Sequence, residues 1–391
     1  MNLIGIARKN LIRSWSGSLL SILLLMFGVA GILLLLKVER QLNERFERNI
    51  KGINLVLGAP GSPLQLILSA VYQIDAPTGN ISAPKANFLI KNPLIEKAIP
   101  LAYGDNYGGY RIVGSTPAYI DHYEAKISQG RMFENNMEVV LGASTAKNSG
   151  LKIGDTFYSA HGFDDTQDVH KNVSFTVVGI LENSGSVLDQ LIICTIESVW
   201  MVHPPEEGAE PKREYTAVLL KQRNPTAMVT LPEMAKLNGM QTALPSIEMN
   251  RLTQNFGIGK TVLQNVAGSI ILLSLLSIFV SLLSSLKDRK YELAIMRTMG
   301  AGRGKLFALI QLEGLILSII GFVLGYLLSL FGLWLFSRLL ESEFKYTMAF
   351  FNPGLLEIWV LAATVIVGLT ASLLPAIKAS ATDISQTLNN E

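Results

Sequence analysis

Two of the four histidines and three aspartates are packed into the ten residues from His161 to His170. Imidazole and carboxylate groups are ligands for zinc and similar ions. The spacing matches no specific zinc motif, however, and acidic residues are common at the tips of hairpins. We therefore favour a solvated hairpin loop and keep a metal site as the alternative. The candidate ligands of that site are His161, Asp164, Asp168 and His170.

The chain has no recognisable catalytic motif. Residues 257–261, GIGKT, resemble the end of a phosphate-binding loop, but Gln254 stands where that motif requires a glycine. The sequence also has no His-Glu-x-x-His helix and no nucleophile elbow. We therefore predict that the chain is not an enzyme and binds no cofactor directly, so any ATP hydrolysis must come from a separate subunit.

The composition is too apolar for an ordinary soluble protein. Of 391 residues, 49% are hydrophobic and only 16% are charged, and the mean hydropathy is +0.35. Part of the chain must therefore lie in lipid. The formal net charge of +2 is too close to neutral to indicate nucleic-acid binding, so nucleic acid is excluded as a partner.

Four apolar runs are each long enough to cross a hydrocarbon core of about 30 Å. They predict transmembrane helices at residues 17–36, 261–286, 306–336 and 355–377. A cleavable signal peptide is the alternative interpretation of the first run, with a small-residue site at residues 28–30. The apolar run continues past that site to Leu36, so we expect it to be retained as a span.

The Lys and Arg residues predict the orientation of these spans. They concentrate at residues 8–13 and in the segment 287–305, and basic loops stay in the cytoplasm. The long segment 37–260 is then extracytoplasmic, residues 337–354 form a short outer loop, and the tail 378–391 returns to the cytoplasm. The sequence thus predicts an inner-membrane protein with both termini cytoplasmic. Residues 1–16 carry an apolar stripe at helical spacing, which predicts an amphipathic elbow helix.

The third span contains residues that are unusual in lipid. Gly321 and Gly325 lie four residues apart, and Gly332 follows near the same line, so this face predicts close helix packing within the chain or against a partner. An unpaired carboxylate at Glu313 would be costly. We favour a structural carboxylate that pairs with a basic neighbour or reaches the interface over a proton pathway.

The extracytoplasmic segment predicts a folded α/β domain inserted between the first and second spans. Short apolar runs alternate there with turn residues. A helix is expected at residues 64–72, and Cys194 is expected to be a buried strand residue, not a reactive thiol. Strands are expected at residues 53–57, 137–141, 156–159, 174–180, 191–195 and 216–220.

Residues 286–317, LKDRKYELAIMRTMGAGRGKLFALIQLEGLIL, carry a family resemblance. They resemble the loop and third span of the MacB/FtsX/LolC-LolE-type permeases of ABC transporters. The family pattern is Arg-x-x-Glu, then Arg-x-x-Gly-Ala, then a glutamate early in the third span. It is filled here by Arg289, Glu292, Arg297, Gly300, Ala301 and Glu313. Segments 130–142, 151–155 and 175–179 resemble the MacB-like periplasmic domain of this family, and residues 375–383 resemble its tail.

This resemblance implies a permease subunit of a mechanotransmitting ABC transporter. Two permeases, either two copies or this chain with a paralogue, would join a dimer of cytoplasmic ATPases. The segment 287–305 would form a coupling helix, with Arg289, Glu292, Met296, Arg297 and Gly300 as the candidate contact residues. ATP-driven movement would be passed to the periplasmic domain to export or extract a lipoprotein, peptide or amphiphile, with a possible periplasmic partner.

Two other functions fit the same architecture. The chain could regulate a periplasmic hydrolase or a metal-homeostasis system. It could also be a sensor or scaffold without transport, whose outer domain binds a ligand. A stoichiometric ATPase partner separates the sensor from the permease.

Overall fold

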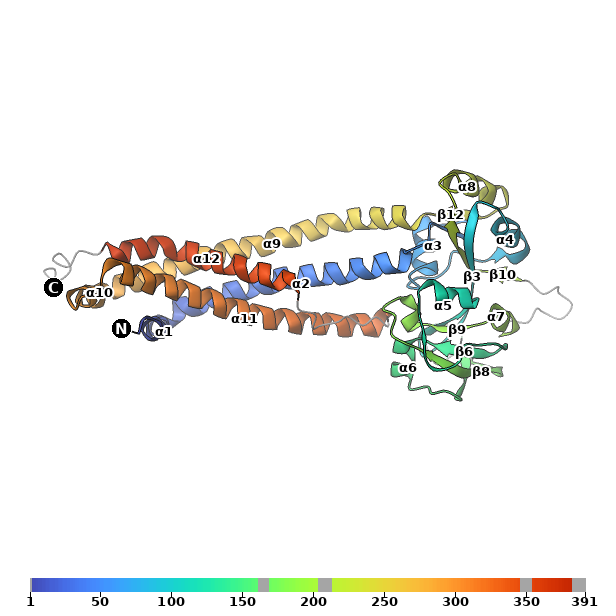
Figure 1. The fold of residues 1–391 in the computed structure, drawn as a ribbon, viewed down its shortest axis with the longest axis horizontal. Coiled ribbons are helices and arrows are strands. Elements are labelled where there is room, and N and C mark those ends of the chain that lie inside the picture. Colours follow the sequence, from blue (N-terminus) through green and yellow to red (C-terminus); the bar gives the residue numbers. More distant parts are fainter. Residues whose placement is uncertain (1, 161–168, 203–212, 345–353, 382–391) are drawn as a thin grey trace. The chain divides into compact units, whose positions relative to one another are not determined.

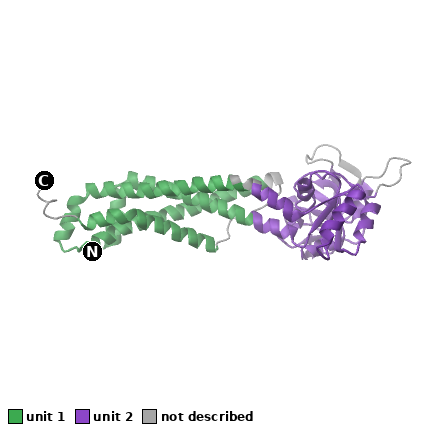
Figure 2. Ribbon diagram, turned by 90° about the horizontal axis from the view of Figure 1, so that it is seen from above, with its two compact units in different colours: residues 1–41, 256–340, 347–391 green, residues 42–255, 341–346 purple. Residues whose placement is uncertain are grey.

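The computed structural model describes residues 2–160, 169–202, 213–344 and 354–381 (Figure 1). The chain divides into two compact units (Figure 2). The first comprises residues 1–41, 256–340 and 347–391, and the second comprises residues 42–255 and 341–346. We call them the helical unit and the inserted domain.

The helical unit is built from six helices in its described residues. Four of them, α2, α9, α11 and α12, are long and apolar enough to cross a membrane. The other two, α1 and α10, are short. The bounds are α1 Leu3–Arg13, α2 Trp15–Ile50, α9 Pro245–Asp288, α10 Lys290–Thr298, α11 Arg303–Phe344 and α12 Leu355–Ser380.

Several of these helices are longer than the apolar runs that identified them. Helix α2 continues to Ile50 through the charged sequence KVERQLNERFERNI, which contains no Gly or Pro to end it. Helix α9 begins at Pro245, well before its apolar run. Hydropathy therefore marks where lipid-compatible sequence ends, and backbone breakers mark where a helix ends.

The small residues of α11 pack against α2 within the same chain. A Cβ atom on Gly321 would lie 2.7 Å from the Cβ of Leu25, and one on Gly325 would lie 2.8 Å from the Cβ of Val29. Gly332 faces α2 less tightly, at 3.3 Å. Real Cβ atoms do not approach this closely at the first two positions, so glycine there lets the two backbones meet.

The inserted domain is a mixed sheet with short helices. The strand order is β12-β1-β11-β3-β4-β9-β6-β8-β5, β7 pairs with β3 and β8, and β2 and β10 form a separate pair. The strands are β1 Leu55–Gly58, β2 Ile81–Ser82, β3 Ile95–Tyr107, β4 Tyr110–Gly114, β5 Ile127–Gly130, β6 Glu138–Leu141, β7 Thr156–Ala160, β8 Val169–Leu181, β9 Ile192–Cys194, β10 Glu214–Tyr215, β11 Ala217–Gln222 and β12 Gln241–Ala243.

Helices pack against this sheet, and its central strands β1, β6, β9 and β11 are buried on both faces. The helices are α3 Pro63–Ala70, α4 Ala83–Ile90, α5 Pro117–His122, α6 Ala143–Ser149, α7 Ile196–Val202, α8 Ala227–Leu237 and the short 3-10 helix η1 Val187–Gln190. Alternate residues of one strand enter different cores: Leu55 and Leu57 lie in one cluster and Val56 in the other. The sequences of these central strands are therefore nearly continuous apolar runs. The predicted fold class, four membrane helices with an inserted α/β domain, is confirmed.

The glycines of segment 130–142 stand where a side chain cannot fit. A Cβ on Gly130, whose φ is +77°, would lie 2.2 Å from the carbonyl oxygen of Val178, and one on Gly142 would lie 2.1 Å from that of Leu188. Between them, Arg131 donates two hydrogen bonds to the Glu138 carboxylate, at 2.8 and 2.5 Å. This guanidinium holds the pKa of Glu138 well below its usual range.

The close packing of α11 against α2 predicts that a large side chain at Gly325 destabilises the helical unit. Gly325→Leu should destabilise the helical unit by about 1–3 kcal/mol, because the side chain would collide with Val29 and with the Met26 carbonyl. Gly268→Leu on α9 is the matched control, since a Cβ there meets nothing within 4 Å. The measurement is the monodisperse fraction after heating in detergent. Equal melting of the two variants would contradict the packing role.

The thiol of Cys194 can report the unfolding of the inserted domain. The side chain is buried in β9, which confirms the strand prediction, and burial followed by the nearby Glu197 raises the pKa of its thiol. At pH 7.5 the thiol is therefore neutral and shielded. A maleimide dye should label the full chain only as heating unfolds the inserted domain. Rapid labelling of the folded protein at 25 °C would show that the site is open.

Candidate functional site

Helix α10 and the residues that hold it form the candidate site. The helix runs from Lys290 to Thr298, and its own residues Leu293 and Ala294 are buried. Gly300 has a φ of +90°. Its amide donates to the Arg297 carbonyl at 3.0 Å, and the Ala301 amide donates to the Met296 carbonyl at 2.9 Å. These two bonds form a Schellman motif, so Gly300 ends the helix in a conformation that favours glycine.

A buried ion pair anchors the start of α10. Arg289, between α9 and α10, donates two hydrogen bonds of 3.1 Å from its Nη atoms to the Glu313 carboxylate on α11. Its Nε donates to the Ser285 carbonyl at 3.1 Å. The Nδ2 of Asn10, on α1, donates to Glu313 Oε1 at 2.7 Å. The two charged side chains are only 5% and 1% exposed, and the bidentate geometry satisfies both.

These contacts decide between the two interpretations of Glu313. The carboxylate pairs with a basic neighbour, as the structural interpretation predicts. The pair also links α1, α11 and the junction of α9 with α10. A second, exposed ion pair joins α1 to α10, because Arg13 Nη1 lies 2.5 Å from Glu292 Oε1. The exposed pair contributes little energy by itself.

The predicted contact residues therefore lie in different surroundings. Arg289 is buried, Glu292 is exposed, and Met296 and Arg297 are partly buried. Sequence reasoning missed a second apolar face on α10. Tyr291, Ile295 and Met299 are 48%, 37% and 82% exposed, and they recur every four residues. That spacing was the available signal, since buried Leu293 and Ala294 occupy the opposite side of the helix.

The predicted metal site has no structural test. His161, Asp164 and Asp168 lie outside the described residues, and only the backbone of His170, in β8, is described. Strands β7 and β8 pair antiparallel, with Ala160 opposite Val169, so the segment 161–168 connects two hairpin strands. Within the described part of the chain, no group of three or more His, Cys, Asp or Glu side chains could hold a metal ion.

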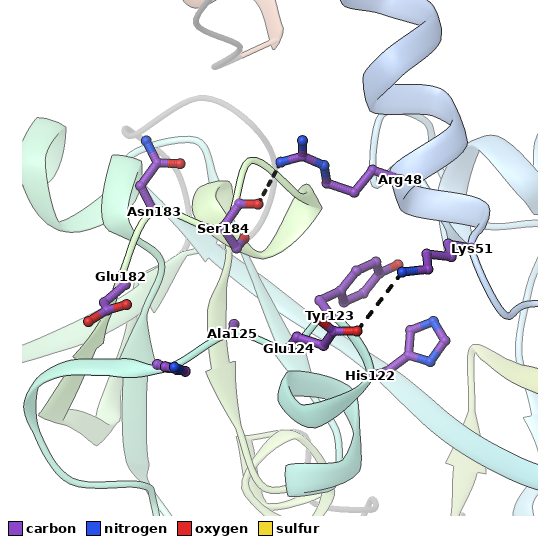
Figure 3. Close-up of a pocket in the computed structure, with 10 residues that line it drawn as sticks. Arg48, Lys51, His122, Tyr123, Glu124, Ala125, Glu182, Asn183 and Ser184 are labelled. Atoms are coloured by element: carbon purple, nitrogen blue, oxygen red, sulfur yellow. Dashed lines mark hydrogen bonds and ion pairs between the residues drawn. The ribbon is translucent and has the colours of Figure 1, made fainter.

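The inserted domain contains a polar cavity of about 360 Å³ (Figure 3). Arg48 and Lys51, at the end of α2, lie on one side of it, and His122 lies at the end of α5. Arg48 donates to the Ser184 carbonyl at 2.8 Å, and Lys51 lies 4.0 Å from the Glu124 carboxylate. The remaining lining residues are Tyr123, Ala125, Lys126, Glu182 and Asn183.

His122 is a neutral group in this cavity. Burial, followed by the charge of Lys97, lowers the pKa of its imidazole. Its Nε2 is buried, and none of the described residues forms a hydrogen bond with it. The charged side chains of Arg48, Lys51, Glu124, Lys126 and Glu182 line the cavity, which suits a polar ligand better than an apolar one.

Comparison with protein families gives two matches that together cover most of the chain. Residues 18–245 match the MacB-like periplasmic core domain, and residues 266–384 match the FtsX-like permease C-terminal region. The second match includes the whole of α10 and Glu313.

One curated relative is an uncharacterised ABC transporter permease protein of Mycobacterium tuberculosis. It is 27% identical over an alignment of 268 residues, and the match covers 64% of this chain and 29% of the relative. The chain thus spans less than a third of the length of that relative.

Two solved structures resemble part of the chain. The periplasmic region of MacB from Actinobacillus actinomycetemcomitans has 18% identity and a TM-score of 0.37, covering 52% of this chain and 95% of that structure. The extracellular domain of the noncanonic ABC-type transporter YknZ from Gram-positive bacteria has 13% identity and a TM-score of 0.32, covering 48% and 99%.

The buried pair predicts a large asymmetry between single and double substitutions. Glu313→Gln should cost roughly 3–5 kcal/mol, because Arg289 would remain buried without a counter-charge. Arg289→Met combined with Glu313→Leu should keep most of the stability, since it removes both charges and Asn10 is only half-buried. Melting in detergent measures both. If the single variant melts like the wild type, the pair does not anchor α10.

Proposed function

Because this chain belongs to the FtsX-like permeases with a MacB-like periplasmic core domain, we propose that it couples ATP hydrolysis by a separate cytoplasmic ATPase to movements of its periplasmic domain. It is an ABC transporter permease of the MacB/FtsX type. The work done by those movements is export or extraction of a lipoprotein, peptide or amphiphile. The complex contains an ATPase dimer and a second permease, either another copy or a paralogue. A periplasmic partner is a further expected component.

The exposed apolar stripe of Tyr291, Ile295 and Met299 carries this proposal. A short helix that lies in water gains no stability by exposing three large apolar residues on the face opposite its buried one. The stripe suits a helix that lies in a groove of a partner protein. The basic residues of segment 287–305 favour the cytoplasmic side, where ATP is present.

The anchors of α10 supply the coupling. Leu293, Arg289 and Glu292 tie the helix to the rest of the helical unit, so a displaced α10 pulls on α1 and α11. Helices α2 and α9 each hold residues of both units, which makes them the route by which force reaches the periplasmic domain. In this scheme Arg289 is a positioning residue, and the stripe together with Glu292 makes the contact.

A sensor that does not transport is the second candidate function. The polar cavity around His122 favours it, because that cavity gives the inserted domain a place for a charged ligand. A regulator of a periplasmic hydrolase or of metal homeostasis would use the same domain. Purification from native membranes in mild detergent, followed by mass spectrometry, separates the sensor from the permease. A stoichiometric Walker-type ATPase supports the permease, and repeated recovery with a kinase or with no ATPase supports the sensor.

The contact face predicts a selective loss of coupling. Ile295→Glu should reduce both ATPase recovery and substrate-stimulated ATP hydrolysis at least tenfold, because it places a charge in an apolar interface. Gly304→Glu is the control, since it adds the same charge to the same segment at an exposed position where a Cβ meets nothing within 4 Å. Both variants should be produced and melt like the wild type. Retained ATPase binding by Ile295→Glu would exclude the stripe as the contact.

A further inference from the structure

A second cavity lies at the α10 end of the helical unit, with a volume of about 310 Å³. Lys287, at the end of α9, Lys290, at the start of α10, and Lys378, near the end of α12, all line it. The described lining residues include no carboxylate. The other lining residues are Leu283, Leu286, Leu293 and Ala379.

The position of these lysines is set by the membrane spans. Lys287 and Lys378 directly follow the apolar runs 261–286 and 355–377, so both ammonium groups belong to the boundary between hydrocarbon and water. Positive charge is expected on this side of a membrane protein. That rule counts charges in loops, however, and does not explain why lysines from three helices converge on one cavity.

The cavity wall changes from apolar to basic along α9. Leu283, Leu286 and Lys287 lie at positions i, i+3 and i+4, and therefore on one helix face. Leu286 is 7% exposed, and Leu293 and Ala379 are also buried. The three lysines are exposed in the structure, and together their positive charges attract an anion to this cavity.

We propose that this cavity binds the phosphate headgroup of an anionic phospholipid, with an acyl chain along Leu283 and Leu286. A soluble phosphate would use the three lysines but would leave the leucine wall unused. A phospholipid uses both, and basic pockets at this depth between membrane helices suit such headgroups. The proposal rests on the membrane topology of the permease and is independent of ATPase coupling.

Native mass spectrometry of the full chain in mild detergent tests the site. Phosphatidylglycerol and phosphatidylcholine are titrated separately against the wild type and two variants. Lys287→Gln, Lys290→Gln and Lys378→Gln are combined in the first variant. Lys9→Gln, Arg303→Gln and Lys305→Gln are combined in the second, which loses the same charge from exposed residues of the same side that do not line the cavity.

The wild type should prefer phosphatidylglycerol over phosphatidylcholine about a hundredfold, since each lysine near an anionic headgroup contributes roughly a factor of five. The first variant should lose this preference, and the second should keep it. Equal loss in both variants, or an unchanged preference in the first, overturns the site.

Two further arms identify the occupant. Glycerol phosphate and inorganic phosphate should each fail to displace phosphatidylglycerol at equal concentration, and displacement by either would assign the cavity to a soluble phosphate and overturn the lipid. If the first variant loses the ATPase but keeps its lipid preference, the lysines contact a protein and the proposal fails. The ATPase recovery of Ile295→Glu is read separately, so failure here leaves the coupling proposal intact.

Discussion

The position of α10 in the helical unit depends on the ion pair between Arg289 and Glu313. Burying two charges costs several kcal/mol each, and only good geometry offsets that cost. Here the guanidinium makes three donations, two of them to a carboxylate that also accepts from Asn10. Any register that separates these groups leaves a charge unpaired in the interior. The pair therefore fixes how α10 lies more than it adds net stability, and it keeps Ile295 on the outside.

Lipid removes the usual drive for helices to associate, and the chain replaces it with close backbone contact. A buried leucine in the inserted domain gains by leaving water, whereas a leucine in a membrane span already lies among hydrocarbon. Gly321 and Gly325 therefore let α11 approach α2, and Gly368 lets α12 approach α11 so closely that a Cβ would lie 1.6 Å from Ser318 Oγ. Close backbone contact therefore stabilises the helical unit, whereas removal of apolar side chains from water stabilises the inserted domain.

The sequence predicts the membrane spans and the apolar strands well, but it does not identify which strands or side chains pair with one another. The spans follow from hydropathy, and β6, β9 and β11 follow from apolar runs that a sheet buried on both faces requires. Strand β3 was missed because Pro100 and Gly104 interrupt its pattern, although Gly108 and Gly109 between Tyr107 and Tyr110 are a hairpin signal. A basic partner for Glu313 was predicted, but it was not identified as Arg289, because a motif gives spacing and not partners, and the two residues lie 24 positions apart.

The segment from Lys287 to Lys305 meets several demands because a short helix has several faces. Topology requires positive charge there, but any position in the loop would satisfy that rule. The structure uses the charges separately. Arg289 turns inward to Glu313, and Lys287 and Lys290 face a cavity bounded by leucines. The apolar residues divide in the same way, with Leu293 buried and Tyr291 outside. A change at one face can therefore be separated from a change at another, even though the residues are neighbours in sequence.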